Sequence, residues 1–222
     1  YSKEMEHDSC GVGLIASTEG RKSREVVQYG IEALKAVWHR GAVDADGKTG
    51  DGAGIHLEIP KDFFIEKIEV TGHTHDGSDI CVGMIFLPRN DYASQESCKT
   101  IVESELTKNN FSIYGWRQVP VNPKVLGEKA FQTMPEIIQV LFKSNDKNML
   151  DKDLERKIYE TRKKIENKAF DLSLNNFYIC SISSKSIIYK GMFLAEAISD
   201  FYLDLRDKRF ISRYAIFHQR FS

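Results

Sequence analysis

Residues 12–16 form a short, almost unbroken apolar run that begins directly after Cys10 and Gly11. A run of this kind is typical of a buried strand. Glycine at positions 11 and 13 leaves no side chain there, which indicates that another part of the chain packs closely against the strand backbone. We therefore expect a buried strand over 12–16, with the Cys10 thiol at its beginning.

Helical and extended patterns follow one another along the rest of the chain. Apolar residues at helical spacing predict a helix over 24–38, ending at His-Arg-Gly of 39–41, and the Asp- and Gly-rich residues 43–52 predict an extended loop. Residues 183–185 (Ser-Ser-Lys) predict a hairpin turn. Long helices mixed with antiparallel strands indicate an α+β domain. The remaining predictions are strands over 53–59, 80–87, 111–119, 137–142, 177–182, 186–189 and 214–217, and helices over 91–108 and 149–168.

Composition and charge exclude two classes of partner. Hydrophobic residues make up 41% of the 222 residues, charged residues make up 28%, and the formal net charge is −1. No segment is apolar enough to cross a bilayer, and the interspersed charges provide no basic field for a phosphate backbone. We expect neither a membrane nor a nucleic acid as partner. We also find no glycine-rich phosphate loop, so nucleotide binding is not indicated.

The four cysteines are widely spaced and include no Cys-x-x-Cys pair. This pattern argues against a metal site and against a disulfide framework, and it favours a reducing compartment such as the cytoplasm. Cys81, Cys98 and Cys180 lie within apolar segments, where free cysteines are ordinary packing residues. Cys10 is therefore the candidate for chemistry.

Several short motifs, taken together, are typical of one family. They are residues 6–13, 30–34, 39–42, 49–55, 59–60 and 218–222. By these motifs the chain resembles the amino-terminal glutaminase domain, a class II glutamine amidotransferase, of the large subunit of glutamate synthase. The resemblance implies an N-terminal-nucleophile (Ntn) hydrolase fold, a four-layer αββα arrangement with stacked antiparallel sheets, here incomplete at its carboxyl end.

The resemblance implies that Cys10 is the catalytic nucleophile. Its thiolate would attack the side-chain amide carbon of L-glutamine and form a thioester that water hydrolyses, releasing ammonia. A free thiol with a pKa of about 8.5 needs a base, which in the family is the α-amino group of the nucleophile itself. Residues 1–9 are therefore expected to be a leader that is removed, leaving 10–222 as the amidotransferase domain. The alternative for Cys10 is a small buried packing residue.

Two arginines are expected to bind the substrate. Arg40, at the end of the first predicted helix, would hydrogen-bond glutamine or hold the loop around it. Arg220 would bind the α-carboxylate of glutamine with two parallel hydrogen bonds. The alternatives are a cation that complements a helix dipole for Arg40 and a solvated strand end for Arg220. Asp51 is expected to shape the loop backbone only. His39 and His218 are expected to be hydrogen-bonded histidines rather than bases, because this chemistry needs none.

The family also implies partners outside the chain. The full subunit would use the ammonia for reductive amination of 2-oxoglutarate, with FMN and a 3Fe-4S cluster beyond residue 222. A small FAD- and NADPH-binding subunit would be a further partner. No cofactor is expected in 10–222. An Asn-Gly oxyanion site and a substrate-binding Asp would follow Ser222, so the fragment alone is expected to be nearly inactive. The expected compartment is the cytoplasm, or a plastid for a ferredoxin-type enzyme. The alternatives are another N-terminal-cysteine amidotransferase and a noncatalytic remnant that only binds.

Overall fold

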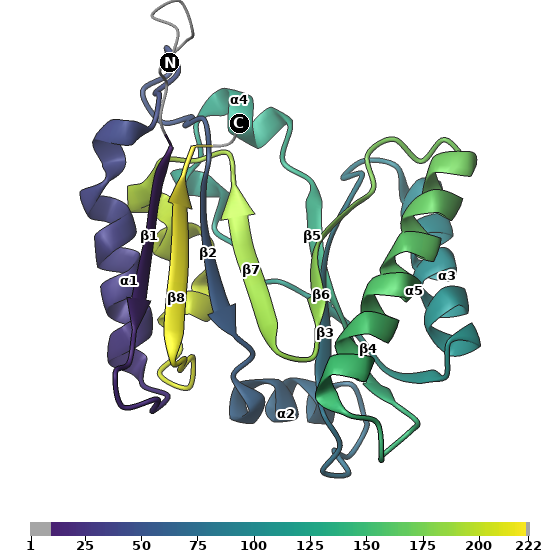
Figure 1. Ribbon diagram of the computed structural model, residues 1–222. Helices are drawn as coiled ribbons and strands as arrows, with labels where there is room; N and C mark the ends of the chain where they lie inside the picture. Colours follow the sequence, from purple (N-terminus) through teal and green to yellow (C-terminus); the bar gives the residue numbers. More distant parts are fainter. Residues whose placement is uncertain (1–9, 221–222) are drawn as a thin grey trace, which may run out of the picture.

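The computed structural model describes residues 10–220, and these residues form two four-stranded antiparallel sheets with helices beside them (Figure 1). The first sheet has the order β1-β8-β2-β7 and the second β4-β5-β3-β6. The strands are β1 (Gly11–Ala16), β2 (Ala53–Glu58), β3 (Cys81–Leu87), β4 (Phe111–Gln118), β5 (Glu136–Ser144), β6 (Tyr178–Ser183), β7 (Ser186–Gly191) and β8 (Tyr214–Gln219). Every strand predicted from the sequence is present, with ends shifted by two residues at most.

The helices include several that the sequence analysis did not predict. The α-helices are α1 (Arg24–Ala36), α2 (Lys61–Val70), α3 (Tyr92–Lys108), α4 (Glu128–Gln132), α5 (Asp151–Asp171) and α6 (Ile198–Phe201). Short 3₁₀ turns occur at η1 (Trp38–Arg40), η2 (Pro123–Val125), η3 (Ala195–Ala197) and η4 (Leu203–Arg206). The predicted helices correspond to α1, α3 and α5, whereas α2, α4 and α6 were missed. Within the described residues, none of the helices combines the length and apolarity needed to span a membrane.

Helix α1 packs on the first sheet, and its sequence explains why. Ser23 caps the helix by accepting a hydrogen bond from the Val26 amide at 3.2 Å, which satisfies one of the amides left open at a helix start. Val27, Ile31 and Leu34 then form a buried stripe at helical spacing. Because this stripe faces β8, β1 and β2, the carboxyl end of α1 and the following η1 come to lie at one end of the first sheet.

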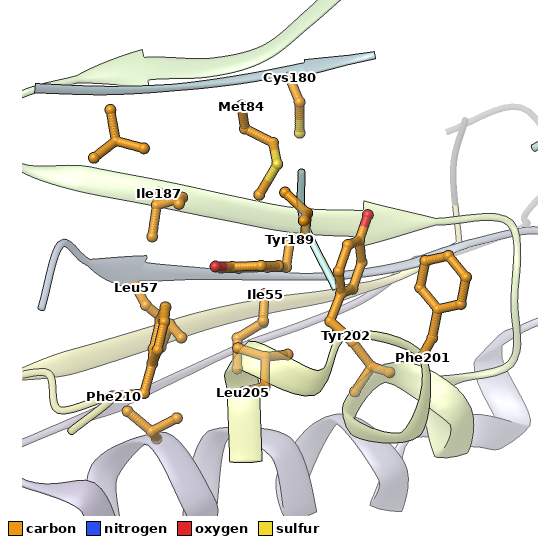
Figure 2. Close-up of a cluster of buried hydrophobic side chains, with 14 of the residues drawn as sticks. Ile55, Leu57, Met84, Cys180, Ile187, Tyr189, Phe201, Tyr202, Leu205 and Phe210 are labelled. Atoms are coloured by element: carbon orange, nitrogen blue, oxygen red, sulfur yellow. The ribbon is translucent and has the colours of Figure 1, made fainter. Parts of the chain in front are cut away.

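Two separate apolar clusters hold the layers together. One lies between α3, α5 and the second sheet, and includes Val102, Phe142 and Ile158. The other joins the two sheets and α1. Figure 2 shows part of it, with Met84 and Cys180 from the second sheet on one side of Tyr189 and with Ile55 on the other.

The strand β1 differs from the prediction in its burial. Gly11, Gly13 and Ile15 face the covered side of the sheet, and the close approach predicted at Gly13 is confirmed, because an added Cβ atom would overlap the ring of Phe217. Val12 and Leu14, however, are 64% and 61% exposed. The prediction of a buried strand is therefore wrong for one of its two faces, since side chains alternate between the faces of a sheet.

The predicted hairpin at 183–185 is also only partly right. The chain does turn there, but β6 lies at the edge of the second sheet and β7 at the edge of the first. Glu155 on α5 accepts hydrogen bonds from the Ser184 amide at 2.6 Å and from the Ser183 hydroxyl at 2.9 Å. The turn therefore carries the chain from one sheet to the other, a distinction that two short apolar runs cannot encode.

Candidate active site

The first and last described strands bring Cys10 and Arg220 to the same end of the first sheet. Gly11, the first residue of β1, pairs with Gln219, the last residue of β8. Cys10 precedes this pair on one strand and Arg220 follows it on the other, so the two residues flank the terminal pair of the sheet. Strand register therefore places the predicted nucleophile and the arginine predicted to bind the carboxylate of glutamine next to each other.

Arg40 reaches the same place from η1, the turn that follows α1. A Cβ atom added at Gly11 would lie 3.2 Å from both Cβ and Cγ of Arg40 and 3.3 Å from Cγ2 of Val37. The aliphatic stem of Arg40 therefore packs on the backbone of the residue that follows Cys10, and a larger residue than glycine would push it away. Arg40 itself is exposed. Arg40 is thus an exposed residue that packs against the backbone next to the candidate nucleophile.

Of the four cysteines, Cys10 is the one that is not buried. Burial raises the pKa of the Cys98 thiol to about 11 and that of Cys180 to about 12, and it raises the pKa of Cys81 further still. Because the thiolate is the nucleophile, these three thiols are unreactive at neutral pH. Their predicted role as packing residues is confirmed by their burial. His39 is exposed on η1, and His218 is half-buried on β8.

The loop before β2 is held by its own side chains. The carboxylate of Asp46 accepts hydrogen bonds from the Thr49 hydroxyl at 2.6 Å, the Thr49 amide at 2.6 Å and the Lys48 amide at 2.9 Å. These bonds, led by the one from the Thr49 hydroxyl, hold the pKa of Asp46 well below its usual range. Buried Thr49 also accepts a hydrogen bond from the Ala130 amide of α4 at 3.3 Å. The loop is therefore a fixed element rather than a flexible connection.

Arg220 contacts the end of this loop, and the sequence analysis did not predict that contact. The Arg220 amide donates a hydrogen bond to the Gly52 carbonyl at 2.7 Å, and Nε of Arg220 lies 3.3 Å from Oδ2 of Asp51. Arg220 has φ +84°, a left-handed conformation that is uncommon for residues other than glycine. No signal in the sequence reveals this pair, because it depends on the register between β2 and β8.

Asp51 and Gln219 form a small buried polar cluster next to Gly41. Gln219 is 1% exposed, and a Cβ atom added at Gly41 would lie 3.0 Å from Cδ of Gln219 and 3.1 Å from Oδ1 of Asp51. Within residues 10–220, Oδ1 and Oδ2 of Asp51 and Oε1 of Gln219 are sealed from solvent and accept no hydrogen bond. The contact between Asp51 and Arg220 is thus an ion pair without hydrogen-bond alignment.

An apolar cavity of about 540 Å³ opens beside this cluster, between the two sheets. Asp51 lines it, whereas Cys10, Arg40 and Arg220 do not. The candidate chemistry is therefore centred outside the cavity, at the end of β1 and β8. In the described part of the chain, no three Cys, His, Asp or Glu side chains converge as metal ligands would. The other lining residues include Phe86, Met134, Ile137, Met192, Phe193 and Tyr202.

An accessible thiol, two arginines and a rigid acidic loop at one end of an antiparallel sheet are an arrangement suited to an amide substrate with a carboxylate. The sequence model for the family described as glutamine amidotransferases class-II matches residues 10–222. The chain therefore belongs to the class II glutamine amidotransferases.

Curated relatives narrow the resemblance within that family. The chain is 54% identical, over all 222 residues, to the glutamate synthase [NADPH] large chain of Azospirillum brasilense, covering 15% of that protein. It is 41% identical over 219 residues to ferredoxin-dependent glutamate synthase 1 of Arabidopsis thaliana, and 37% identical over 219 residues to the ferredoxin-dependent enzyme of Spinacia oleracea. Each of these two alignments covers 98% of this chain and 13% of the relative. The chain thus spans about a seventh of the length of these proteins.

Proposed function

We propose that this chain is the glutaminase part of a glutamate synthase, and that it hydrolyses L-glutamine to glutamate and ammonia with Cys10 as the nucleophile. The observation that carries the proposal is the convergence of Cys10, Arg40 and Arg220 at one end of the first sheet. The thiol attacks the Cδ amide carbon, the C–N bond breaks and ammonia leaves with a proton. Water then cleaves the thioester and restores the thiol.

The base in this reaction is the α-amino group of Cys10, which exists once residues 1–9 have been removed. A peptide nitrogen cannot accept the thiol proton, because its lone pair is delocalised into the amide. The free amine takes the proton from Sγ and passes it to the leaving nitrogen. The leader lies outside the described residues, and its removal is part of the proposal. So is the domain boundary at Cys10.

The two arginines bind the substrate. The guanidinium of Arg220 takes the α-carboxylate of glutamine as a planar fork, and Arg40 lies beside the nucleophile where it holds the bound amino acid in place. A bound and oriented amide reacts far faster than a free one, because the encounter has become intramolecular. Strand register supports this assignment for Arg220, and the packing of Arg40 on Gly11 supports it for Arg40.

The same proposal includes the four-layer αββα architecture of the Ntn hydrolases. The contacts of α1 with the first sheet, and those of α3 and α5 with the second, support it. We infer that the Asn-Gly oxyanion site and the Asp that binds the substrate amine belong to residues after 222. On this basis residues 10–222 alone have little glutaminase activity.

In the longer protein, the ammonia is used for reductive amination of 2-oxoglutarate. FMN and a 3Fe-4S cluster supply the electron transfer there, and a small FAD- and NADPH-binding subunit is a partner in the NADPH-dependent type. The described residues do not fit either group, since they offer neither a glycine-rich phosphate loop nor converging thiolates. No step of the glutaminase reaction depends on them. The compartment is the cytoplasm, or a plastid for a ferredoxin-dependent type.

The test is a Cys10→Ala variant of the full-length protein. We expect loss of glutamine-dependent synthesis, by roughly a factor of 10⁴ or more, with ammonia-dependent synthesis retained. Glutamate formation from each nitrogen source measures both activities in one preparation. The intact mass of the wild-type protein shows whether the mature chain begins at Cys10. Full glutamine use by the variant would contradict the proposal, and a mature chain that keeps residues 1–9 without glutaminase activity would favour a noncatalytic binding domain.

A further inference from the structure

We propose that Asp51 is a positioning residue that fixes the direction of the Arg220 guanidinium, so that Arg220 can receive the α-carboxylate of glutamine. This proposal rests on the function proposed above and deepens it. The contact in question is the ion pair of 3.3 Å between Nε of Arg220 and Oδ2 of Asp51.

The backbone of Arg220 is constrained by the same loop that carries Asp51. The Arg220 amide donates to the Gly52 carbonyl at 2.7 Å, and φ of Arg220 is +84°. A residue with a side chain adopts this conformation only where its surroundings determine it. Arg220 therefore meets residues 51 and 52 twice, through its backbone and through its guanidinium. These two contacts to one rigid loop constrain both the backbone position and the side-chain direction of Arg220.

The state of the Asp51 carboxylate indicates that this ion pair matters to Asp51 too. Both oxygens are sealed from solvent, and among residues 10–220 they accept no hydrogen bond. An ionised carboxylate that has lost its water needs a cation or a donor in return. The guanidinium of Arg220 supplies such a cation, with Nε 3.3 Å from Oδ2. If either side chain turned away, Asp51 would lose this compensation.

The geometry of the pair suits carboxylate binding. A guanidinium has five N–H donors in one plane, and the contact with Asp51 is made through Nε. This contact holds Nε of Arg220 beside the loop, at the end of β8. A substrate carboxylate then meets an oriented fork instead of a flexible cation.

Charge alone predicts the opposite effect, which makes the proposal easy to contradict. Asp51 and the substrate carboxylate are both negative, so Asp51 weakens the attraction of this site for glutamine through simple repulsion. If orientation dominates, removing the negative charge raises KM for glutamine. If repulsion dominates, removing it lowers KM.

The experiment compares Asp51→Asn with Asp62→Asn in the full-length protein. Both changes replace a carboxylate by an amide, but Asp62 is exposed on α2, away from the loop and the end of β8. We expect D51N to raise KM for glutamine on the order of tenfold, with kcat changed by less than about threefold. We expect D62N to leave KM within about twofold. Melting temperature and ammonia-dependent synthesis, measured on the same preparations, report folding.

Two further variants separate this proposal from the proposed function. Arg220→Lys should raise KM by itself, and D51N should add little to it in the double variant, because Asp51 acts through Arg220. Asp51→Glu keeps the charge and adds one methylene, so its KM should fall between those of wild type and D51N. If D51N does not fold, wild type is compared with D51E instead.

The possible results decide separately on the role of Asp51 and on the proposed function. Normal KM in D51N and D51E beside a raised KM in R220K would overturn the role of Asp51 and leave the proposed function standing. A lowered KM in D51N would show that repulsion dominates, which also overturns it. Equal KM values in wild type and R220K would overturn the substrate-binding role of Arg220 and with it that of Asp51. A wild-type protein that does not use glutamine would instead remove the proposed function.

Discussion

Gly13 lies in the first sheet at a position with no room for a side chain. An added Cβ atom would overlap the ring of Phe217 and lie 2.7 Å from its Cε2 atom, and Phe217 is 6% exposed. A buried aromatic ring cannot move away without displacing its own neighbours. The glycine therefore sets the distance between β1 and the core beneath it, and with it the position of Cys10 at the beginning of the strand.

We expect Gly13→Ala to lower the free energy of unfolding by about 1–3 kcal/mol, the cost of adding a methyl group to a packed core. Val12→Ala is the matched control on the same strand, because Val12 is 64% exposed on the opposite face. It should change stability by no more than about 0.5 kcal/mol. Urea denaturation of both variants measures the difference, and equal midpoints would contradict the role given to Gly13.

What the sequence could reveal about single residues depended on local signals. The glycines at 11 and 13 predicted the close approach to the β1 backbone correctly. The exposure of Val12 was not predictable, because an apolar run does not say which face is covered. Arg40 and Arg220 were named from the family motifs. Asp51 was expected only to shape its loop, since its contact with Arg220 joins distant parts of the chain.

At the scale of elements, α2 is fixed to the segment before β8 by one arginine. Arg209 donates hydrogen bonds to Glu66 on α2 and to Asp207, with Nη2 of Arg209 2.7 Å from Oδ2 of Asp207. Its guanidinium also lies over the ring of buried Phe63, 5.6 Å from the centroid. The contact ties a helix to a chain segment more than a hundred residues away.

The bonds to Arg209 lower the pKa of Glu66 from 4.5 to about 2 and that of Asp207 from 3.8 to about 2. A lowered carboxylate pKa stabilises the fold above the ordinary value, and this contribution is lost as the pH falls towards 2. We therefore expect the melting temperature of the wild type to fall more steeply between pH 4.5 and pH 2 than that of Arg209→Gln. Thermal unfolding followed by circular dichroism at several pH values measures both slopes, and parallel curves would refute the assignment.

The helix α2 was missed in the sequence for a reason visible at its start. Pro60 follows the strand β2, where a proline ordinarily ends an element, but it also serves as the cap residue before Lys61. Proline fits the first turn of a helix because the amide it lacks has no partner there. Phe63, Phe64 and Ile68 are the buried face of this helix, in only ten residues. A pattern that short does not distinguish a helix from a loop with a few apolar residues.

At the scale of the whole molecule, a buried polar network joins the two sheets. Arg117 on β4 makes a bidentate pair with Asp204, with distances of 2.6 and 2.8 Å. Asp204 also accepts a hydrogen bond from the Tyr189 hydroxyl on β7 at 3.0 Å, and its side chain is 2% exposed. Arg117 belongs to the second sheet and Tyr189 to the first, so Asp204 couples the two.

Removing Asp204 should be costly, because it leaves a buried guanidinium without its partner. We expect Asp204→Ala to lower the free energy of unfolding by about 3–5 kcal/mol. The matched control is Asp79→Ala, which breaks the exposed pair with Lys61 and should cost no more than about 1 kcal/mol. Denaturant unfolding of the two variants gives the comparison. Similar losses in both would mean that the network does not couple the sheets.

The sequence predicted the strands better than their assembly. All eight strands were expected near their observed positions, since short β-branched and aromatic runs carry that signal locally. The pairing of β1 with β8 and the separation of β6 from β7 were not encoded in any short segment. Sheet order is decided by which faces can be buried together, a property of the folded whole.

The pairing of β1 with β8 has a consequence for the timing of assembly in the cell. Ribosomes add about 5–20 residues per second, so on the order of 10–40 s separates the emergence of Cys10 from that of Arg220. Throughout that interval the nascent thiol lacks the strand that positions it. The end of the first sheet beside Cys10 can therefore form only after β8 has left the ribosome.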